Sequence, residues 1–356
     1  MAYNGKDGEP AGGPVQIADA HNDLLMLVQH FRGDAGYFRR NWLPQLQAGQ
    51  VATQVLPVYV DEEWLPELAL RQTFRLIETA LTTIESCAEL MLCQEPGDVE
   101  RALADGRIGI VLALEGCPAI GLDVELLRTM HRLGVRVASL THFGRNSLAD
   151  GSAEDDTQGR LTRAGVAAVE LMQSLGMLVD VSHLSLAGTR HVLDVTRAPV
   201  LATHSSCRAL RVHHRNLPDP ELRAIAATGG VIGINFFPLF IAEGPPSIGS
   251  VVDHVEHAVA VAGVDHVGLG PDFTREIATV LYGGDHVIEG CDMAASVPGL
   301  AGPADLPALA AALSERGFGP ADVTAVMGGN LRRLLNESIG GAAGRLPADS
   351  LVADRR

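Results

Sequence analysis

The chain has 356 residues, of which 47% are hydrophobic and 20% are charged, which is enough apolar sequence for a large core and too little charge for a disordered protein. Aspartate and glutamate outnumber lysine and arginine by 43 to 27, and the net charge of −16 disfavours binding to nucleic acid or anionic lipid. The longest apolar run, residues 231–242, is too short to cross a bilayer, and neither end resembles a signal peptide or a lipid-anchor signal. We therefore expect a globular cytoplasmic protein with no nucleic-acid or membrane partner.

Short β-branched runs alternate along the chain with longer stretches of helical periodicity, a pattern typical of βα units around a parallel sheet. Eight strands are predicted, at residues 15–19, 52–60, 108–114, 135–141, 177–182, 200–203, 230–236 and 266–270. Helices are predicted at residues 65–93, 124–133, 162–175, 186–196, 221–227, 251–262, 306–316 and 321–336. The predicted N-caps are Asp123, Ser185 and Asp219, and the glycines predicted to end helices in the left-handed conformation are Gly134, Gly176, Gly229 and Gly263.

Eight strands joined by right-handed crossovers can close on themselves and so remove both edges of the sheet. The sequence therefore predicts an α/β fold, a single (β/α)8 barrel of the TIM type at residues 15–338, with a flexible leader at 1–14 and a flexible tail at 339–356. An open, doubly wound sheet is the alternative. A nucleotide-binding version of that sheet would lack its phosphate loop, because the chain contains no GxGxxG after a strand and no GxxxxGK[ST].

A histidine or a carboxylate follows six of the eight predicted strands: His21 and Asp23 after the first, and then Glu115, His142, His183, His204 and Asp272. In a parallel barrel the carboxyl ends of all strands lie on one face, so these side chains would meet at one mouth. Seven residues of these types at equivalent positions are improbable by chance. We therefore predict a functional site at the carboxyl ends of the strands.

The residue types in this group favour divalent metal ions. His21 and Asp23 point to the same side of an extended segment and could bind one ion, while His183 and His204 suit a second. Glu115 lies between the two sets in strand order and could bridge the ions. Imidazole and carboxylate ligands without thiolate favour zinc, with manganese or cobalt as alternatives. Two ions about 3.5 to 4 Å apart would hold and acidify a water molecule, so the predicted reaction is metal-assisted hydrolysis by hydroxide.

The five cysteines and the single lysine argue against several other kinds of site. The five cysteines form no CxxC pair, which argues against a disulfide framework and against a thiolate zinc site. Cys207 could be a nucleophile, although a small buried thiol is the commoner role of a free cysteine. Lys6 is the only lysine, which excludes a Schiff base or a carbamylated lysine in the barrel and so argues against barrel phosphoesterases that use such a bridge.

The same segments resemble a known family. DAHNDLL, LEG, LTHFGRN, DVSHLS, THSSCR, HHRNLPD, GINFFP, GLGPDF and GGNLRRLL occur in the order found in membrane (renal-type) dipeptidases, peptidase family M19 of the amidohydrolase superfamily. LPQLQAGQVATQ at residues 43–54 is similar to the family's segment before the second strand. The resemblance covers residues 15 to about 336, and it implies a homodimeric hydrolase of small dipeptides that also accepts D-residue-containing and dehydro dipeptides.

The resemblance implies a role for each matching residue. Two zinc ions per chain would be held by His21, Asp23 and Glu115 on one side and by Glu115, His183 and His204 on the other, with Glu115 bridging. The remaining residues would act on the substrate: His142 on the carbonyl oxygen, Arg215 on the free carboxylate, Asp272 on the amino group and as proton carrier to the leaving amine, and Asn330 at the end of the site.

The chain departs from the family pattern at two places that bear on the substrate. Asp272 is followed by Phe273, Thr274, Arg275 and Glu276 in place of a DFDG-like segment, and Phe236-Phe237 stands where some members have a tyrosine. A metal-dependent amidohydrolase acting on another small amide or modified peptide in specialised metabolism is therefore an open alternative. A catalytically silent binding barrel is disfavoured, because no predicted metal ligand is missing.

Overall fold

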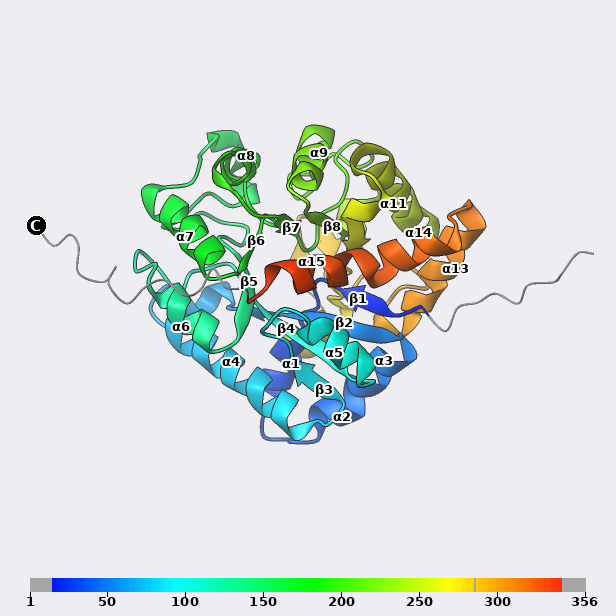
Figure 1. Cartoon of the computed structure of the whole chain (residues 1–356), viewed down its shortest axis with the longest axis horizontal. Helices are drawn as coiled ribbons and strands as arrows, with labels where there is room; N and C mark the ends of the chain where they lie inside the picture. The colour runs from blue at the N-terminus through cyan, green and yellow to red at the C-terminus, as the bar shows by residue number, and fades with distance from the viewer. Residues whose placement is uncertain (1–14, 285, 341–356) are drawn as a thin grey trace, which may run out of the picture.

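The computed structural model describes residues 15–284 and 286–340 and shows a closed parallel barrel surrounded by helices (Figure 1). Its strands run in the order β2-β1-β9-β8-β7-β6-β5-β4-β3, and an additional β2–β4 pairing closes the sheet. The strands are β1 Ile17–Asp19, β2 Val51–Tyr59, β3 Leu90–Leu92, β4 Ile108–Glu115, β5 Val135–Ser139, β6 Leu178–Asp180, β7 Val200–Ala202, β8 Val231–Ile234 and β9 Val267–Leu269. The eight predicted strands correspond to β1, β2 and β4–β9, so the predicted (β/α)8 barrel is confirmed.

Helices fill the connections between the strands. They are α1 Leu24–His30, α2 Tyr37–Asn41, α3 Leu43–Ala48, α4 Ala69–Ser86, α5 Asp98–Ala104, α6 Leu126–Arg132, α7 Arg163–Ser174, α8 Leu186–Val195, α9 Asp219–Ala227, α10 Pro238–Ile241, α11 Ile248–Ala262, α12 Arg275–Leu281, α13 Leu306–Arg316, α14 Pro320–Thr324 and α15 Asn330–Ser338. Short 3-10 helices occur at Glu62–Trp64, Ser152–Thr157, Val264–His266 and Pro303–Asp305. All four predicted helix-ending glycines have positive φ, and the Ser185 hydroxyl caps α8. The other two predicted caps were wrong: Glu125 precedes α6, and Pro218 precedes α9.

The helix predicted at residues 65–93 was wrong in its last seven residues, 87–93, which contain the strand β3. Cys87 is extended and ends α4, and the buried run Leu90–Leu92 then pairs in parallel with Ile108–Ile110 of β4. β4 is longer than β3 and β5, so β3 covers the start of one edge and β5 covers the rest from Leu112 onward. Apolar periodicity alone did not separate this short buried strand from the helix before it.

The helix predicted at residues 321–336 is also interrupted. A wide helical turn, Ala325–Gly329, separates α14 from α15, and Gly328 lies outside the helical region within it. A Cβ atom on Gly328 would lie 2.6 Å from the carbonyl oxygen of Gln16 and 2.7 Å from the amide nitrogen of Ala18. Glycine therefore allows this turn to lie directly against β1.

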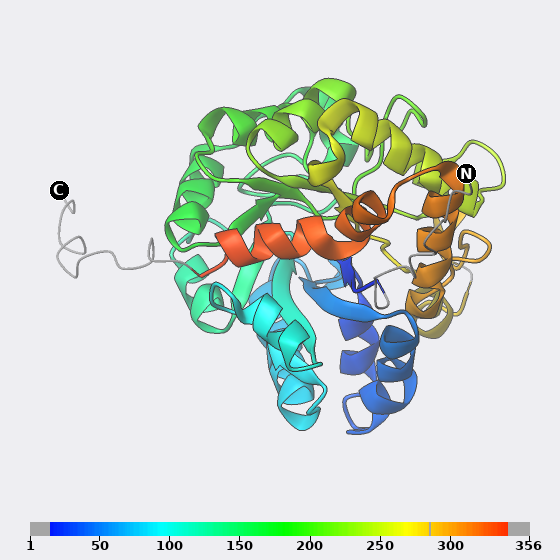
Figure 2. The same ribbon diagram turned by 45° about the vertical axis from the view of Figure 1, so that its right-hand side comes forward.

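Helix α15 closes the end of the barrel opposite the strands' carboxyl ends. Leu331, Leu334 and Leu335 pack with inward-facing strand residues such as Val55, Val111, Val137, Leu178, Leu201 and Val231 in one buried cluster. Figures 1 and 2 show α15, in red and orange, crossing this end of the barrel. The polar residues that follow the strands lie at the other end of the barrel.

The limits of the packed domain differ slightly from the prediction. Ile339 is fully buried and the amide of Gly340 donates to the carbonyl of Gly176, so these two residues belong to the folded domain and not to the predicted tail. The predicted leader at 1–14 and the rest of the predicted tail, 341–356, lie outside the described residues. No helix in the described part of the chain is long and apolar enough to span a membrane.

Candidate metal and substrate site

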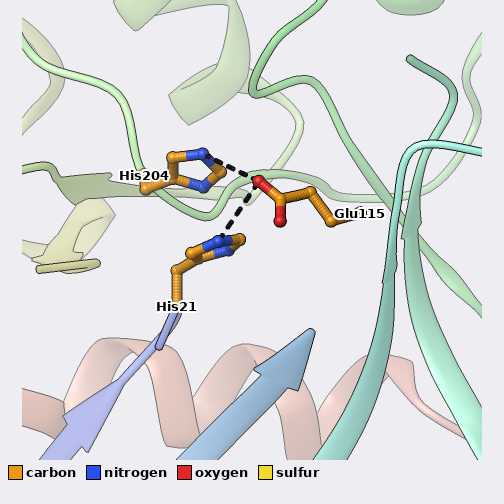
Figure 3. A group of neighbouring side chains, drawn as sticks. All are labelled: His21, Glu115 and His204. Carbon is orange, nitrogen blue, oxygen red and sulfur yellow. Dashed lines mark ion pairs between the residues drawn. The ribbon is translucent and has the colours of Figure 1, made fainter. Parts of the chain in front are cut away.

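The predicted metal-binding residues come together at the carboxyl ends of the strands. Glu115 is the last residue of β4, and its Oε1 atom lies 3.3 Å from Nε2 of His21, which follows β1. The same oxygen lies 3.0 Å from Nε2 of His183, after β6, and 3.7 Å from Nε2 of His204, after β7. Figure 3 shows the Glu115 carboxylate beside the neighbouring rings of His21 and His204, with one oxygen facing both. One carboxylate oxygen thus faces three imidazoles from three other strands.

Asp23 and Asp272 extend this cluster on the His21 side. Asp23 Oδ2 lies 3.5 Å from Nε2 of His21, and ligand atoms of His21, Asp23 and Asp272 all lie within 4.8 Å of one another. Two further overlapping groups meet the same limit, His21 with Glu115 and His204, and Glu115 with His142 and His183. All seven residues predicted after the strands therefore lie in one connected cluster.

The charges in this cluster are poorly satisfied by the protein alone. Burial, with the nearby Asp23 carboxylate, raises the pKa of Glu115 to about 8. Burial lowers the pKa of both His183 and His204 well below the usual range, whereas the carboxylates of Glu115 and Asp23 outweigh burial and raise the pKa of His21. Buried atoms including His21 Nε2, Asp23 Oδ1 and His183 Nδ1 lack a hydrogen-bond partner among the described residues.

Divalent cations fit this arrangement. The donors are imidazole nitrogens and carboxylate oxygens with no thiolate, which suits zinc and also manganese or cobalt. Cations between these atoms would neutralise the buried carboxylates and occupy the unpartnered lone pairs. His21, Asp23, Glu115, His183 and His204 are the residues that could hold them.

Two of the site residues have an unusual backbone. His183 and Asp272 have φ values of +68° and +58°, in the left-handed region that non-glycine residues rarely occupy. Such conformations cost of the order of 1 to 3 kcal/mol and cluster at functional sites. The fold therefore aims both side chains into the barrel mouth at the expense of local strain, a feature that residue types alone do not reveal.

His142 belongs to the cluster through its contact with His183, and its imidazole is neutral. Its ring centroid is 4.3 Å from that of His183 and 4.7 Å from that of Tyr59, a residue that the sequence analysis did not identify. Burial, helped by the Arg215 charge, lowers the pKa of His142 to about 3. A neutral ring keeps one N–H at neutral pH and can donate a hydrogen bond to a developing oxyanion.

Asp272 is held by Asn235, a second residue missed in the sequence. The Asn235 side-chain amide donates to Asp272 Oδ2 at 2.9 Å, and its own oxygen accepts the Phe237 amide at 2.6 Å. Burial raises the pKa of Asp272 above its ordinary value, which favours a carboxyl group able to carry a proton. An asparagine inside the apolar run directly after β8 was the available signal.

Arg215 is a buried cation with few partners. It is 3% exposed, and its guanidinium donates one hydrogen bond, from Nη2 to the His204 carbonyl at 3.2 Å, while Nε has no partner among the described residues. The rings of Phe143 and Phe240 lie 5.8 and 5.5 Å from Cζ. Burial lowers the pKa of Arg215 to about 10. A guanidinium so placed offers an anionic ligand a strong partner.

Asn330 and Cys207 are placed away from this chemistry. The Asn330 amide donates to the carbonyls of Val264 and Val267 at 2.7 Å each, at the amino end of β9, so the structure does not bring it to the barrel mouth. Cys207 is buried with its thiol 3.4 Å from the His254 carbonyl oxygen, and burial raises the pKa of Cys207 to about 12. Cys207 is therefore the small buried thiol and not an activated nucleophile.

A cavity of about 380 Å3 opens onto the cluster and is lined by Asp23, Glu115, His142, His183 and Asp272 at its base. Its outer wall includes Ile277 of α12 and Ile288, Glu289 and Met293. These last three lie in or beside a hairpin that the sequence analysis did not predict, formed by β10 Val287–Ile288 and β11 Cys291–Asp292. The segment that departs from the family pattern after Asp272 thus leads into one wall of the cavity.

The hairpin is fastened to the loop that carries Arg215. The Glu289 carboxylate accepts hydrogen bonds from Nε2 of His213 at 3.0 Å and of His214 at 2.8 Å. These three residues also lie close enough to hold a metal ion. However, His213 Nδ1 accepts the Arg215 amide at 3.1 Å, so neutral His213 carries its hydrogen on Nε2 and donates it to Glu289. We call these three residues the His–Glu clasp.

The clasp should make stability depend on pH. Burial, with the neighbouring His214, lowers the pKa of His213 from 6.5 to about 4, so its contribution to stability is complete above pH 6.5 and is lost as the pH falls toward 4. Between pH 7 and pH 5, the metal-free protein should lose about 2 kcal/mol more unfolding free energy than metal-free His213→Gln. Urea unfolding at a series of pH values measures this difference. Parallel curves for the two proteins would contradict it.

Comparisons with known proteins agree with this geometry. The family model for membrane dipeptidases, peptidase family M19, matches residues 14–343. Dipeptidase aclJ of Aspergillus oryzae is 33% identical over 91% of this chain and 78% of its own, and dipeptidase verJ of Clonostachys rogersoniana is 34% identical over 90% and 84%. A solved structure described as dipeptidase AC, a family M19 metallopeptidase, is 25% identical with a TM-score of 0.81, covering 92% of this chain and 99% of that one. A metallopeptidase of Rhodobacter sphaeroides, solved with a phosphinate mimic of L-Ala-D-Ala, shares the fold at a TM-score of 0.81 and 24% identity, over 91% of this chain and 99% of its own.

Proposed function

Because this chain belongs to the membrane dipeptidase family, peptidase family M19, we propose that it hydrolyses the amide bond of small dipeptides with two zinc ions bound at the barrel mouth. The observation that carries the proposal is the position of Glu115, whose Oε1 atom lies within 3.7 Å of three imidazole nitrogens from three other strands. His21 and Asp23 with Glu115 would hold one ion, and Glu115 with His183 and His204 the other. The homodimer and the cytoplasmic location remain predictions from the sequence.

The protein's own residues would prepare the substrate for attack. When bound, paired divalent ions would polarise the scissile carbonyl and lower the pKa of water, so that hydroxide is available near neutral pH. Arg215 would bind the substrate's free carboxylate and so fix the orientation of the dipeptide in the cavity. His142, neutral because its pKa is lowered to about 3, would donate its N–H to the carbonyl oxygen as negative charge develops.

Asp272 would carry the proton from the attacking water to the leaving amine. Its carboxyl group lies next to Asp23 and His21, with one oxygen fixed by Asn235, so the other oxygen can face the reacting amide. Because burial raises the pKa of Asp272, the group can accept a proton from the attacking water and donate it to the leaving amine. A dipeptide's free α-amino group would also find a negative partner in this carboxylate.

Metal analysis and a dipeptide library test the proposal together. Purified protein should bind two zinc ions per chain and cleave unblocked dipeptides, including L,D pairs, and chelation should abolish turnover that added zinc restores. The control is the same library with both termini blocked, which should be poor substrates. A protein that binds two zinc ions and cleaves no dipeptide would contradict the proposal.

A second candidate function concerns the same site acting on another small amide or a modified peptide. The observation that favours it is the cavity wall formed by α12 and the hairpin, where Ile277, Ile288 and Met293 follow the departure from the family pattern. Turnover of modified amides by a zinc-loaded protein that ignores plain dipeptides would favour this candidate.

A further inference from the structure

We propose that Asp180 and Thr203 are positioning residues that fix the tautomer of His204, so that its Nε2 atom presents a lone pair to the metal site. His204 follows β7 and is fully buried, and Asp180 ends the neighbouring strand β6. The inference rests on the proposed function only in treating His204 as a metal ligand. Asp180 and Thr203 lie in segments that resemble the family, but the resemblance gives neither residue a role, and neither belongs to the metal cluster.

Asp180 anchors the arrangement. Its Oδ1 atom accepts the backbone amides of Ser182 and Thr203, both at 2.9 Å. Its Oδ2 atom lies 2.6 Å from the Thr203 hydroxyl. The Ser182 hydroxyl oxygen is a second acceptor but lies farther away, at 3.3 Å. A carboxylate has no hydrogen to donate, so the short contact requires the Thr203 hydroxyl to donate its single hydrogen to Oδ2. The two backbone donors meanwhile fix which carboxylate oxygen faces the hydroxyl.

The direction of that bond determines the tautomer of His204. Thr203 Oγ1 lies 2.7 Å from His204 Nδ1, and with its hydrogen committed to Asp180 it can only accept. Nδ1 must therefore carry the hydrogen of the neutral imidazole, and Nε2 keeps its lone pair. Nε2 lies 2.7 Å from Nε2 of His183 and 3.7 Å from Glu115 Oε1, so the lone pair faces the predicted ligands.

The His–Glu clasp provides the opposite case within the same protein. His213 accepts a backbone amide at Nδ1, carries its hydrogen on Nε2 and donates it to Glu289. His204 and His213, each close to a carboxylate, thus differ in which ring nitrogen has the hydrogen, and of these two only His204 keeps Nε2 unprotonated. Hydrogen bonding of this kind behind a histidine ligand sets its tautomer and ring orientation, and its removal weakens metal binding about 10- to 100-fold.

Asp180→Asn is the sharpest test, because it reverses the direction of the hydrogen bonds from Asp180 through Thr203 to His204 with almost no change in side-chain shape. The backbone amides of Ser182 and Thr203 would hold the asparagine oxygen, leaving the side-chain NH2 group to donate to Thr203 Oγ1. Thr203 would then donate to His204 Nδ1 and move the imidazole hydrogen to Nε2. In the metal-free protein, 15N NMR should show this change of tautomer in the ring resonances of His204, which are identified by their absence from the spectrum of His204→Gln. Zinc affinity, measured with a competing chelator, should fall about 10- to 100-fold.

Thr203→Val and Thr203→Ser form a matched pair. Valine removes the hydroxyl and should weaken zinc binding about as much as Asp180→Asn, whereas serine keeps the hydroxyl and should bind zinc like the wild type. Melting of the metal-free variants controls for folding, and the pair decides the question if Asp180→Asn does not fold. A wild-type tautomer and affinity in Asp180→Asn, or equal affinities for the valine and serine variants, would overturn the proposal. Neither measurement uses dipeptide turnover, so the failure of the proposed function would be seen separately.

Discussion

Replacing Glu115 with glutamine should remove at least one metal ion and lower kcat/KM for dipeptides by about 1000-fold or more, equivalent to a loss of about 4 kcal/mol of transition-state stabilisation. The reason is the position of Oε1, which lies 3.0 to 3.7 Å from the Nε2 atoms of three histidines, where a neutral amide cannot bridge two cations. Metal content per chain and steady-state kinetics measure both effects.

The control for this prediction is Glu62→Gln, which removes a carboxylate from the exposed rim of the same cavity and should leave metal content unchanged. Stability provides a second check. Because burial and Asp23 raise the pKa of Glu115 to about 8, this carboxylate opposes folding of the metal-free protein at neutral pH, and metal-free Glu115→Gln should melt no lower than the metal-free wild type. Full activity with two bound ions in Glu115→Gln would contradict a bridging role.

Replacing Arg215 with alanine should raise KM about 10- to 100-fold for dipeptides that have a free C-terminal carboxylate and leave C-terminally amidated dipeptides unaffected. Arg215 is buried, forms no ion pair within the described part of the chain and has an unpartnered Nε, so a substrate carboxylate would be its main anionic partner. Steady-state kinetics with free and amidated forms of one dipeptide measure the difference.

The matched control is Arg211→Ala, which removes another arginine of the same loop, one that pairs with Glu243 and donates to the Leu239 carbonyl. This variant should discriminate between the two substrates as the wild type does. Equal losses for the free and amidated dipeptides in Arg215→Ala would show that Arg215 acts through the structure of the loop and not through the carboxylate.

The candidate metal-binding residues could be predicted because the topology of the barrel brings them together. His21, Glu115, His183 and His204 are far apart in the sequence, yet each follows or ends a parallel strand, and closure of the barrel is enough to bring them together. Asn330 shows the limit of this reasoning. It matched a motif, but its helix lies at the opposite end of the barrel and its amide is used by two backbone carbonyls.

The features that were missed depend on contacts that periodicity does not encode. The strand β3 is only three residues long, too short to show a period of its own, and begins four residues after the end of α4. The hairpin of β10 and β11 depends on a turn in which Glu289 and Gly290 have positive φ, and on the distant pair His213 and His214. Asn235 and Thr203 become identifiable only when the direction of each hydrogen bond is known.

The position of α15 has a consequence for how the protein is made. Its leucines complete a buried cluster in which most of the other residues come from strands that are synthesised much earlier, beginning with β1. During synthesis the apolar inner residues of these strands therefore remain exposed to water until α15 has been synthesised and can pack against them. A nascent chain stalled before residue 330 would expose this surface, and it is at this stage that we expect the protein to depend most on chaperones.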